Sequence, residues 1–576
     1  MNPPFSILIA TAATVSAPAT TSGSDPGTIP GVTPGVIPGL ARFTALDWAV
    51  LLGYMVIVVI IGVAVSMKRR GADDFFLAGR RIPMWAAAVS VLATSMSAAT
   101  FLGGPQQAYA GNLTYFAVNL AALLAVVLSA LFFIPTYYRL NVTSIYEVLG
   151  RGLGVGAQRA ATVMFMIGRV FASGARLFMV GIPFSTIVFG DTDPQHLALS
   201  IVLISVGATA YTMVGGIRAV IWTDVLQAMV FISCVVIALV WIMVRVPVPA
   251  GDVYDALAAT RHAGGTKLLV LDTQWSLTNQ YTLPAILIGW TLFFLAAFGA
   301  DHDLVQRMLT CRSAKRGAWS VIVSNLLTWP VVALFLLIGL LLYVFYERSD
   351  LMGDAAPGYT VMDQRQVFLE FILHEMGAGM RGLMVAGLFA AAMSTLDSTL
   401  NALASTTVTD FYRPYARRRS ARAAERAGAG HGDSMPRTSA ATPDRAERWV
   451  SRLAVMGWAI VLAGFAFICI TWQTASGKTL IDFALGVMLY AYTGLLAVFM
   501  VTLWTRRGNS VSAITALLTG FVTILTIQMG WLDGVLRPLL DDAGLTSTAR
   551  LAMPWQMVIG TGLSAGVCLI GRRTAE

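Results

Sequence analysis

About thirteen apolar stretches recur along this chain, and each is long enough to cross a bilayer as a helix. Only 12% of the 576 residues are charged, which is about half the share found in a soluble domain. Because a segment in lipid must satisfy its backbone hydrogen bonds internally, these stretches predict an all-α polytopic membrane protein. They lie near residues 46–66, 83–104, 114–136, 157–189, 197–215, 220–244, 281–305, 319–345, 366–410, 450–471, 481–504, 511–531 and 553–571.

Composition divides the chain into four parts. Residues 1–44 are rich in Thr, Ala, Pro and Gly and predict a flexible external tail, with only a faint likeness to a cleaved signal peptide. Membrane helices are expected over 45–410 and again over 450–576. The segment between them, 411–449, holds nine Arg against four acidic residues and predicts a disordered basic linker on the cytoplasmic side.

Basic residues collect in alternate loops between the apolar stretches. Lys68, Arg69 and Arg70 follow the first stretch, and Arg recurs in every second loop, whereas acidic residues gather in the loops between. Basic loops stay on the cytoplasmic side, so the N-terminus is predicted outside and the C-terminus in the cytoplasm. The net charge of +9 thus belongs to these loops and does not indicate nucleic-acid binding. The Ala- and Arg-rich composition is typical of bacteria and favours an inner membrane.

The ninth stretch carries the densest group of polar side chains. Ser394, Asp397 and Ser398 are three or four residues apart, so they share one face of a helix. A carboxylate inside a membrane usually faces an ion, a partner or a pathway, and hydroxyl oxygens beside it suit an alkali cation. The alternative is that the hydroxyls bond to helical carbonyls while the Asp pairs with a base.

The second stretch ends in a Gly-Gly-Pro sequence, which favours a helix that breaks near the middle of the membrane. Unwinding there would expose the backbone carbonyls of Ala93 and Met96 as ion ligands, and Ser97 and Thr100 could face a solute. Close packing of helices through small residues would use the same composition.

The fourth stretch presents Arg169 and Arg176 on one helical face. Buried guanidinium groups need anionic partners, which could be protein carboxylates such as Asp224 or an anionic solute held by two parallel hydrogen bonds. Asp224 enters the otherwise apolar sixth stretch, and with Asp397 it could hold a second cation or neutralise an arginine. Further candidates for lining a pocket are Asn119 and Tyr490.

Five ordered motifs carry a resemblance to a known family. They are Asp74-Phe-Phe-Leu-Ala-Gly-Arg80 with Pro83; Ser97-Ala-Ala-Thr-Phe-Leu-Gly103 with Pro105 and Tyr109; Gly215-Gly216 with Trp222-Thr-Asp224 and Gln227; Asp301 with Val305-Gln-Arg307; and Ala391-Ala-Met-Ser-Thr-Leu-Asp-Ser398. In this order they resemble the sodium:solute symporter family, over roughly residues 45–530. Members of that family couple sodium to the transport of sugars, proline, sialic acid, iodide or vitamins.

The resemblance implies two inverted five-helix repeats with broken helices, here spans 2–6 and 7–11. It also implies a sodium site at Ala93, Met96, Ala391, Ser394 and Thr395. A second sodium site, present in some relatives, maps onto Asp224, Asp397 and Ser398. Family substrate positions fall on Ser97, Thr100, Asn119, Arg169 and Tyr490.

Three departures from the family pattern bear on the solute. Ala99 precedes Thr100 where sugar carriers tend to have larger polar side chains, and Ala491 follows Tyr490 near the sugar site. The sequence Asp301-His-Asp303 replaces the commoner Asp-Gln. These changes disfavour a glucose-type substrate and favour a small carboxylate or another anion, which an Arg at position 169 would suit.

The sequence therefore predicts a sodium-coupled secondary active symporter that imports a small organic solute or anion by alternating access. Na+ is its expected coupling ion, and its expected partners are the solute and the lipid bilayer. No phosphate-binding loop, nucleophile–base pair or zinc motif is present, so an enzyme is not expected. Open alternatives are a proton-coupled symporter using Asp224 or Asp397, and a transporter-like sensor that signals through 411–449.

Overall fold

The computed structural model describes residues 43–66, 76–262, 265–361, 363–426, 445–476, 480–531 and 551–572. Within these ranges the chain is almost wholly helical, and the only strands are the antiparallel pair β1 (Arg261–His262) and β2 (Gly265–Thr266). The predicted all-α fold is thereby confirmed. Almost all of the predicted N-terminal tail and residues 427–444 of the predicted linker lie outside the described residues, so those predictions stay predictions.

Within the described ranges, ten helices are long and apolar enough to cross a membrane, and a bent pair makes an eleventh. Two shorter apolar helices complete the set, so every predicted stretch has a helical counterpart in this multi-pass membrane protein. The spanning elements include α1 (Ala45–Ser66), α3 (Met84–Ser95), α4 (Ala98–Ala110), α5 (Val118–Leu128), α8 (Val155–Phe189), α9 (Pro194–Gly215), α10 (Ile217–Arg245), α15 (Ala314–Glu347), α18 (Met380–Thr406), α20 (Arg445–Ser476), α22 (Leu489–Trp504), α23 (Ser510–Gln528) and α25 (Met553–Ile570).

Shorter elements extend or connect these spans. They are η2 (Ala78–Arg80), η3 (Leu113–Ala117), η4 (Ser129–Phe133), α6 (Ile134–Arg139), α7 (Glu147–Leu153), α11 (Ala250–Ala259), α12 (Leu283–Ala285), η5 (Ile286–Trp290), α13 (Thr291–Leu295), η6 (Ala296–Ala300), α14 (His302–Leu309), α16 (Ser349–Met352), η7 (Gly353–Ala355), η8 (Gln364–Gln366), α17 (Val367–Glu375), η9 (Thr407–Tyr412), α19 (Arg413–Arg426) and α21 (Leu480–Gly486).

Two spans are broken inside the bundle. The pair α3 and α4 bends by 63° at Met96 and Ser97, within the stretch where a break is predicted, whereas the Gly-Gly-Pro sequence itself lies inside α4. The seventh span runs from α12 through η6 and then breaks at Asp301, whose extended backbone separates η6 from α14. No break is predicted here from the sequence, although Gly299 precedes Asp301 and the polar residues His302 and Asp303 follow it. These two spans open the two predicted five-helix repeats, in which broken first helices are a known transporter feature.

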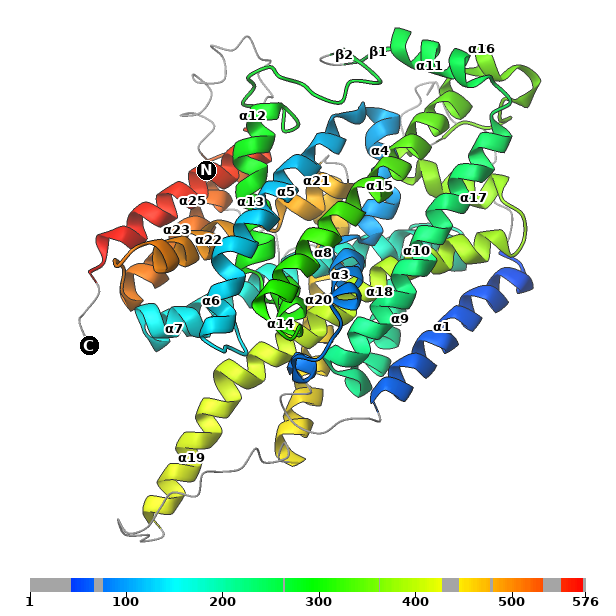
Figure 1. Ribbon diagram of the computed structural model, residues 1–576. Helices are drawn as coiled ribbons and strands as arrows, with labels where there is room; N and C mark the ends of the chain where they lie inside the picture. Colours follow the sequence, from blue (N-terminus) through cyan, green and yellow to red (C-terminus); the bar gives the residue numbers. More distant parts are fainter. Residues whose placement is uncertain are drawn as a thin grey trace, which may run out of the picture.

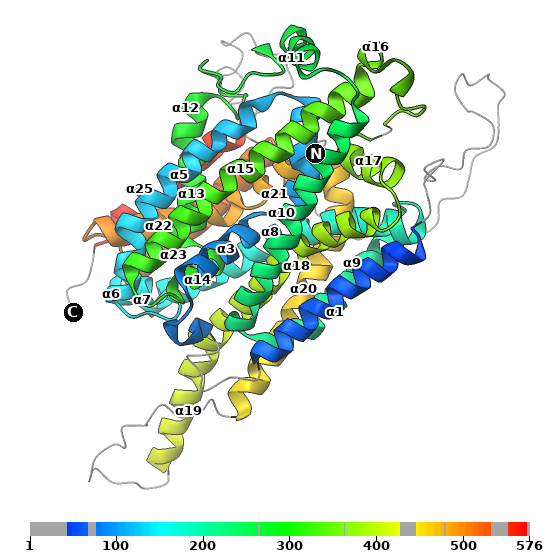
Figure 2. The same ribbon diagram turned by 45° about the vertical axis from the view of Figure 1, so that its right-hand side comes forward.

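The helix α18 lies at the centre of the molecule (Figures 1 and 2). In its apolar window 94% of the residues are buried, compared with 22% for α1 at the periphery. Gly387 allows close contact with α10, because a Cβ there would lie 2.5 Å from Cys234 Sγ. The polar residues of α18 therefore face other helices and not lipid.

The linker differs from its prediction. Residues 413–426, expected to be disordered, form the helix α19, which projects away from the bundle (Figure 1). Ala and Arg are both good helix formers, so α19 continues the helical path of α18 through η9. Arg413 at its start forms an ion pair with Glu447 of α20 at 2.8 Å, which joins the two ends of the predicted linker.

Candidate ion site and solute cavity

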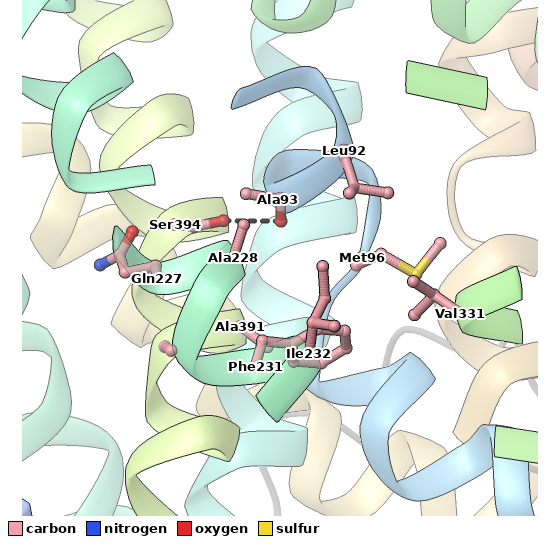
Figure 3. Close-up of a pocket in the computed structure, with 11 residues that line it drawn as sticks. Leu92, Ala93, Met96, Gln227, Ala228, Phe231, Ile232, Val331, Ala391 and Ser394 are labelled. Carbon is pink, nitrogen blue, oxygen red and sulfur yellow. Dashed lines mark hydrogen bonds between the residues drawn. The ribbon is translucent and has the colours of Figure 1, made fainter. Parts of the chain in front are cut away.

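The break in the second span creates potential ligands for an ion. Met96 and Ser97 have extended backbone angles, so the last carbonyls of α3 lose their helical partners. The Ser97 amide instead donates to Thr100 Oγ1 at 3.5 Å. The Ala93 carbonyl accepts a hydrogen bond from Ser394 Oγ of α18, 2.7 Å away (Figure 3). The broken helix and α18 thus meet through oxygen atoms.

A small cavity at this contact gathers the residues predicted to bind sodium. Ala93, Met96, Ala391 and Ser394 line the cavity, whose volume of about 10 Å³ is close to the space of one water molecule (Figure 3). Thr395 lies beside them and donates from Oγ1 to the Ala391 carbonyl at 3.2 Å. The groups that could bind an ion here are backbone carbonyls and side-chain hydroxyls, whose hard oxygen atoms suit an alkali cation.

A larger cavity of about 110 Å³ lies next to this ion cavity, and Met96 lines both. Three of the residues predicted to face the solute, Ser97, Thr100 and Asn119, also line the larger cavity. Much of the remaining wall is apolar and includes Trp290, Phe294, Phe298, Val332 and Ile481. A mainly apolar lining with a few polar groups is typical of small-molecule sites, and the volume is below the range of about 300–1,000 Å³ that such sites occupy.

Arg176 is the basic residue in the wall of this solute cavity. Its Nε atom is enclosed without a hydrogen-bond partner, and one terminal nitrogen reaches only the sulfur of Met488, at 3.8 Å. Among the described residues no carboxylate forms an ion pair with Arg176. An arginine inside a membrane protein calls for an anion, and the described residues supply no carboxylate to Arg176.

Arg169 differs from the sequence prediction, because it is paired within the protein and does not line the solute cavity. Its Nε donates to Asp301 at 3.0 Å, and a terminal nitrogen also binds the same carboxylate. The other terminal nitrogen lies 3.0 Å from Asp303. Tyr492 donates its hydroxyl to Asp301 at 2.6 Å. The guanidinium thus has two carboxylate partners, and neither is the Asp224 considered from the sequence.

Asp224 belongs to the other end of the same buried network. It pairs with Arg307 at 3.2 Å and accepts a hydrogen bond from Ser90 at 2.5 Å. Arg307 also pairs with Asp303, at 3.0 Å. Charges therefore alternate along a continuous row, which joins α10, α14 and α8 across the centre of the bundle and contains Asp224, Arg307, Asp303, Arg169 and Asp301.

The other predicted site residues are dispersed. Asp397 accepts a hydrogen bond from Thr212 at 2.8 Å, whereas Ser398 turns toward Asp303 at 3.3 Å. Tyr490, predicted to line the solute pocket, does not line it and donates its hydroxyl to Gln528 at 3.2 Å. The sequence cannot reveal this orientation, because neighbouring residues of an apolar helix are equally compatible with either side.

Broken helices that border cavities lined by oxygen atoms are a feature of secondary transporters. The chain belongs to the sodium:solute symporter family, whose sequence model matches residues 75–431. The resemblance recognised in the sequence is thereby confirmed, and the protein is a transporter and not an enzyme.

Relatives of the chain are sodium-coupled transporters. It is 29% identical to the sodium/sialic acid symporter SiaT of Proteus mirabilis, over 85% of this chain and 91% of the relative. It is 26% identical to the human sodium-coupled monocarboxylate transporter 1, over 85% of this chain and 74% of that protein. A solved structure of a Na+-coupled sialic acid symporter, in a substrate-bound outward-open state, superposes with a TM-score of 0.71 at 26% identity and covers 92% of this chain and 98% of the other. Sodium-coupled symport is therefore supported for this chain.

Proposed function

We propose that this protein is a sodium-coupled symporter that imports a small organic carboxylate by alternating access. The observation that carries the proposal is Arg176, a guanidinium without a carboxylate partner in a cavity that adjoins the ion cavity. Two relatives are named for acids, one for sialic acid and one for monocarboxylates, which supports an anionic solute. An Arg binds a carboxylate through two parallel hydrogen bonds and so selects it by geometry as well as charge.

Sodium would act by joining two parts of the protein that move. Its ligands come from the broken α3 and from α18, so an ion bound there holds these helices together. Met96 lines both cavities, and a helix fixed by sodium therefore shapes the solute cavity as well. The coupling is reciprocal, so the solute must also strengthen sodium binding. Each sodium ion entering with the membrane potential supplies about 2.3 kcal/mol per 100 mV.

The proposal extends to a second sodium ion near Asp224, Asp397 and Ser398. One carboxylate oxygen of Asp224 and one of Asp397 are buried without a hydrogen-bond partner among the described residues, which leaves both able to accept a cation. If a second ion binds there, Asp397→Asn should lower the number of ²²Na+ ions bound per protein from two to one. A variant that keeps the wild-type number would remove this part of the proposal.

The same proposal assigns the cytoplasmic side to the end that carries α19. The basic α19 lies at one end of the bundle, and α11, α16 and the β1–β2 pair lie at the other (Figures 1 and 2). The opposite end holds Asp252, Asp350 and Asp354. The positive-inside rule places loops rich in Lys and Arg in the cytoplasm, so this acidic end is assigned to the outside. This arrangement supports the predicted cytoplasmic C-terminus.

The test of the ion site is the double variant Ser394→Ala/Thr395→Ala in proteoliposomes. The change removes two of five proposed oxygen ligands, so sodium affinity should fall at least about tenfold, or 1.4 kcal/mol, and sodium-driven uptake should be lost. The measurement is ²²Na+ binding together with uptake of a radiolabelled carboxylate chosen by a thermal-shift screen. Uptake at fixed pH with and without a sodium gradient separates sodium from proton coupling.

A matched control lies on the same helix. Ser405 and Thr406 repeat the Ser-Thr pair about three turns further along α18 and do not line either cavity. Ser405→Ala/Thr406→Ala should therefore keep sodium affinity. Wild-type sodium binding in the Ser394→Ala/Thr395→Ala protein, or an equal loss in the control, would contradict the assignment.

A further inference from the structure

A third cavity lies at the outer end of the bundle and has a chemistry unlike that of the solute cavity. Its volume of about 470 Å³ falls in the range of about 300–1,000 Å³ that small-molecule sites occupy. Its wall is dominated by amide, hydroxyl, imidazole and phenol groups. The residues include Gln107, Asn112, His262, Asp272, Gln274, Thr278 and Tyr281.

The wall of this outer cavity is held in place by the fold. Asp272 accepts hydrogen bonds from the Gln274 amide and from Asn279, each at 3.0 Å. Trp555 of α25 donates to the Ser276 carbonyl at 2.9 Å and packs against Trp275. The loop between β2 and α12 is thus fixed to a membrane helix, so its side chains form a pre-shaped surface.

Two tyrosines separate the outer cavity from the solute cavity. Tyr115 lines both, and its ring meets that of Tyr281 edge-on, with 5.6 Å between the centroids. Tyr281 donates its hydroxyl to Asp482 of α21 at 2.9 Å, and Gln280 donates to the same oxygen at 2.8 Å. Because Tyr115 lines both cavities, a solute that moves directly from the outer cavity to Arg176 passes this tyrosine.

The two cavities carry opposite charges, and this difference restricts which chemical groups of a solute each cavity can bind. Arg176 supplies a cation to the inner cavity, whereas Asp272 supplies a carboxylate to the outer one. Lys267 lies near the outer cavity, but its ammonium group is directed to the carbonyls of Ala108 and Tyr109. The outer wall therefore suits neutral hydroxyl and amide groups, which its amides and hydroxyls can bind.

We propose that the outer cavity binds the hydroxyl-bearing part of a polyhydroxylated organic acid and holds the solute before it passes Tyr115 to Arg176. The Gln274 side-chain amide and the His262 ring are assigned as direct contacts, because neither has a hydrogen-bond partner among the described residues. The tyrosine rings offer apolar faces to the carbon skeleton of such a solute. This inference rests on the proposed function in one respect, which is that the solute carries a carboxylate that Arg176 binds.

The experiment compares uptake of D-gluconate with that of propionate, which has a carboxylate but no hydroxyl groups. In the full-length protein, His262→Ala/Gln274→Ala should raise the KM for D-gluconate about tenfold, since two hydrogen bonds are lost. The maximal rate, the KM for propionate and ²²Na+ binding should stay at wild-type values. The control is Gln195→Ala, an exposed glutamine of α9 that does not line this cavity and should change neither substrate's KM.

An unchanged KM for D-gluconate, or an equal rise for propionate, would overturn the outer site. If neither acid is transported with sodium, the proposed function fails and equilibrium dialysis of D-gluconate decides the outer site separately. In the Arg176→Gln background, where the inner contact is absent, D-gluconate should still bind, and His262→Ala/Gln274→Ala should abolish the remaining binding. Absence of binding before those two substitutions would also overturn the inference.

Discussion

Two of the three arginines of α8, Arg169 and Arg176, lie in regions that offer a buried charge very different surroundings. Arg169 is buried and contacts two carboxylates, and these in turn belong to a row of alternating charges. Arg176, seven residues further along, is half-buried, borders a cavity and has a nitrogen atom without a partner. Seven residues advance a helix by about 10 Å, so the same face meets two different environments.

The difference is the basis for treating Arg169 as a structural cation and for proposing that Arg176 binds the solute. The guanidinium of Arg169 already has its anions, so adding a solute carboxylate would break existing ion pairs. Arg176 can gain an anion without losing one. A cation beside a cavity without a counter-ion costs free energy because it is partly removed from water. A transported anion that binds to it would offset this cost.

The largest expected effect is on Arg169. The substitution Arg169→Gln leaves Asp301 and Asp303 facing each other without their shared cation, and breaking a buried pair costs about 3–5 kcal/mol. We expect a fall in folded protein after heating, measured by size-exclusion chromatography with fluorescence detection. The double variant Arg169→Gln/Asp301→Asn should recover part of the loss, because one unpaired carboxylate is removed.

Arg159 provides the matched control for this prediction. It lies on α8, is half-buried and forms no ion pair among the described residues. Arg159→Gln should change stability by much less than Arg169→Gln. Equal losses in the two variants would show that the row of alternating charges is not what makes Arg169 important.

The next effect concerns solute binding through Arg176. Arg176→Lys keeps the charge but loses the planar fork that binds a carboxylate through two hydrogen bonds. We expect solute affinity to fall by about 10- to 100-fold, which corresponds to roughly 1.4–2.8 kcal/mol, with sodium affinity in the absence of solute unchanged. Isothermal titration of the purified protein with the transported acid measures both. A loss of stability comparable with that of Arg169→Gln, at unchanged solute affinity, would reverse the comparison.

The sequence predicted the spans and a break in the second span near Met96 and Ser97, and its assignment of the first ion site stays a prediction. The spans and the break depend on apolar length and on a run of small and hydroxylic residues, which are local properties of the sequence. The residues of the ion site lie about 300 positions apart and were joined by resemblance to a family, since spacing alone could not join them.

The partners of the two arginines could not be predicted. Arg169 and Asp301 are 132 positions apart, and only the packed bundle shows that they meet while Asp224 pairs with Arg307. The break at Asp301, which aims that carboxylate at Arg169, has no Gly or Pro beside it on the side of α14. The outer cavity was not predicted either. Its polar residues look like an ordinary loop in the sequence, and only the structure shows that Trp555, far along the chain, holds this loop in place.

The buried Lys267 extends the comparison to a cation whose hydrogen-bond partners are neutral carbonyls, and its replacement should have the smallest effect. Its ammonium group donates to the Tyr109 carbonyl and lies 4.0 Å from the centre of the Tyr343 ring. Burial lowers the pKa of Lys267 from 10.5 to about 8, against the opposing effect of Glu347. The unfolded chain therefore binds more protons than the folded protein between pH 8 and pH 10.5, so this group makes stability rise with pH across that window.

Replacing this lysine should remove that pH dependence. In Lys267→Met, the Tm of the wild type relative to the variant should increase by a few degrees at most between pH 7.5 and pH 9.5, as the wild type loses the cost of a buried charge. Thermal unfolding of both proteins over this range is the measurement. Lys315→Met, which alters an exposed lysine of α15, should show no such trend. A Tm difference that does not vary with pH would mean that the carbonyls and the aromatic ring compensate the ammonium of Lys267 as fully as two carboxylates compensate Arg169.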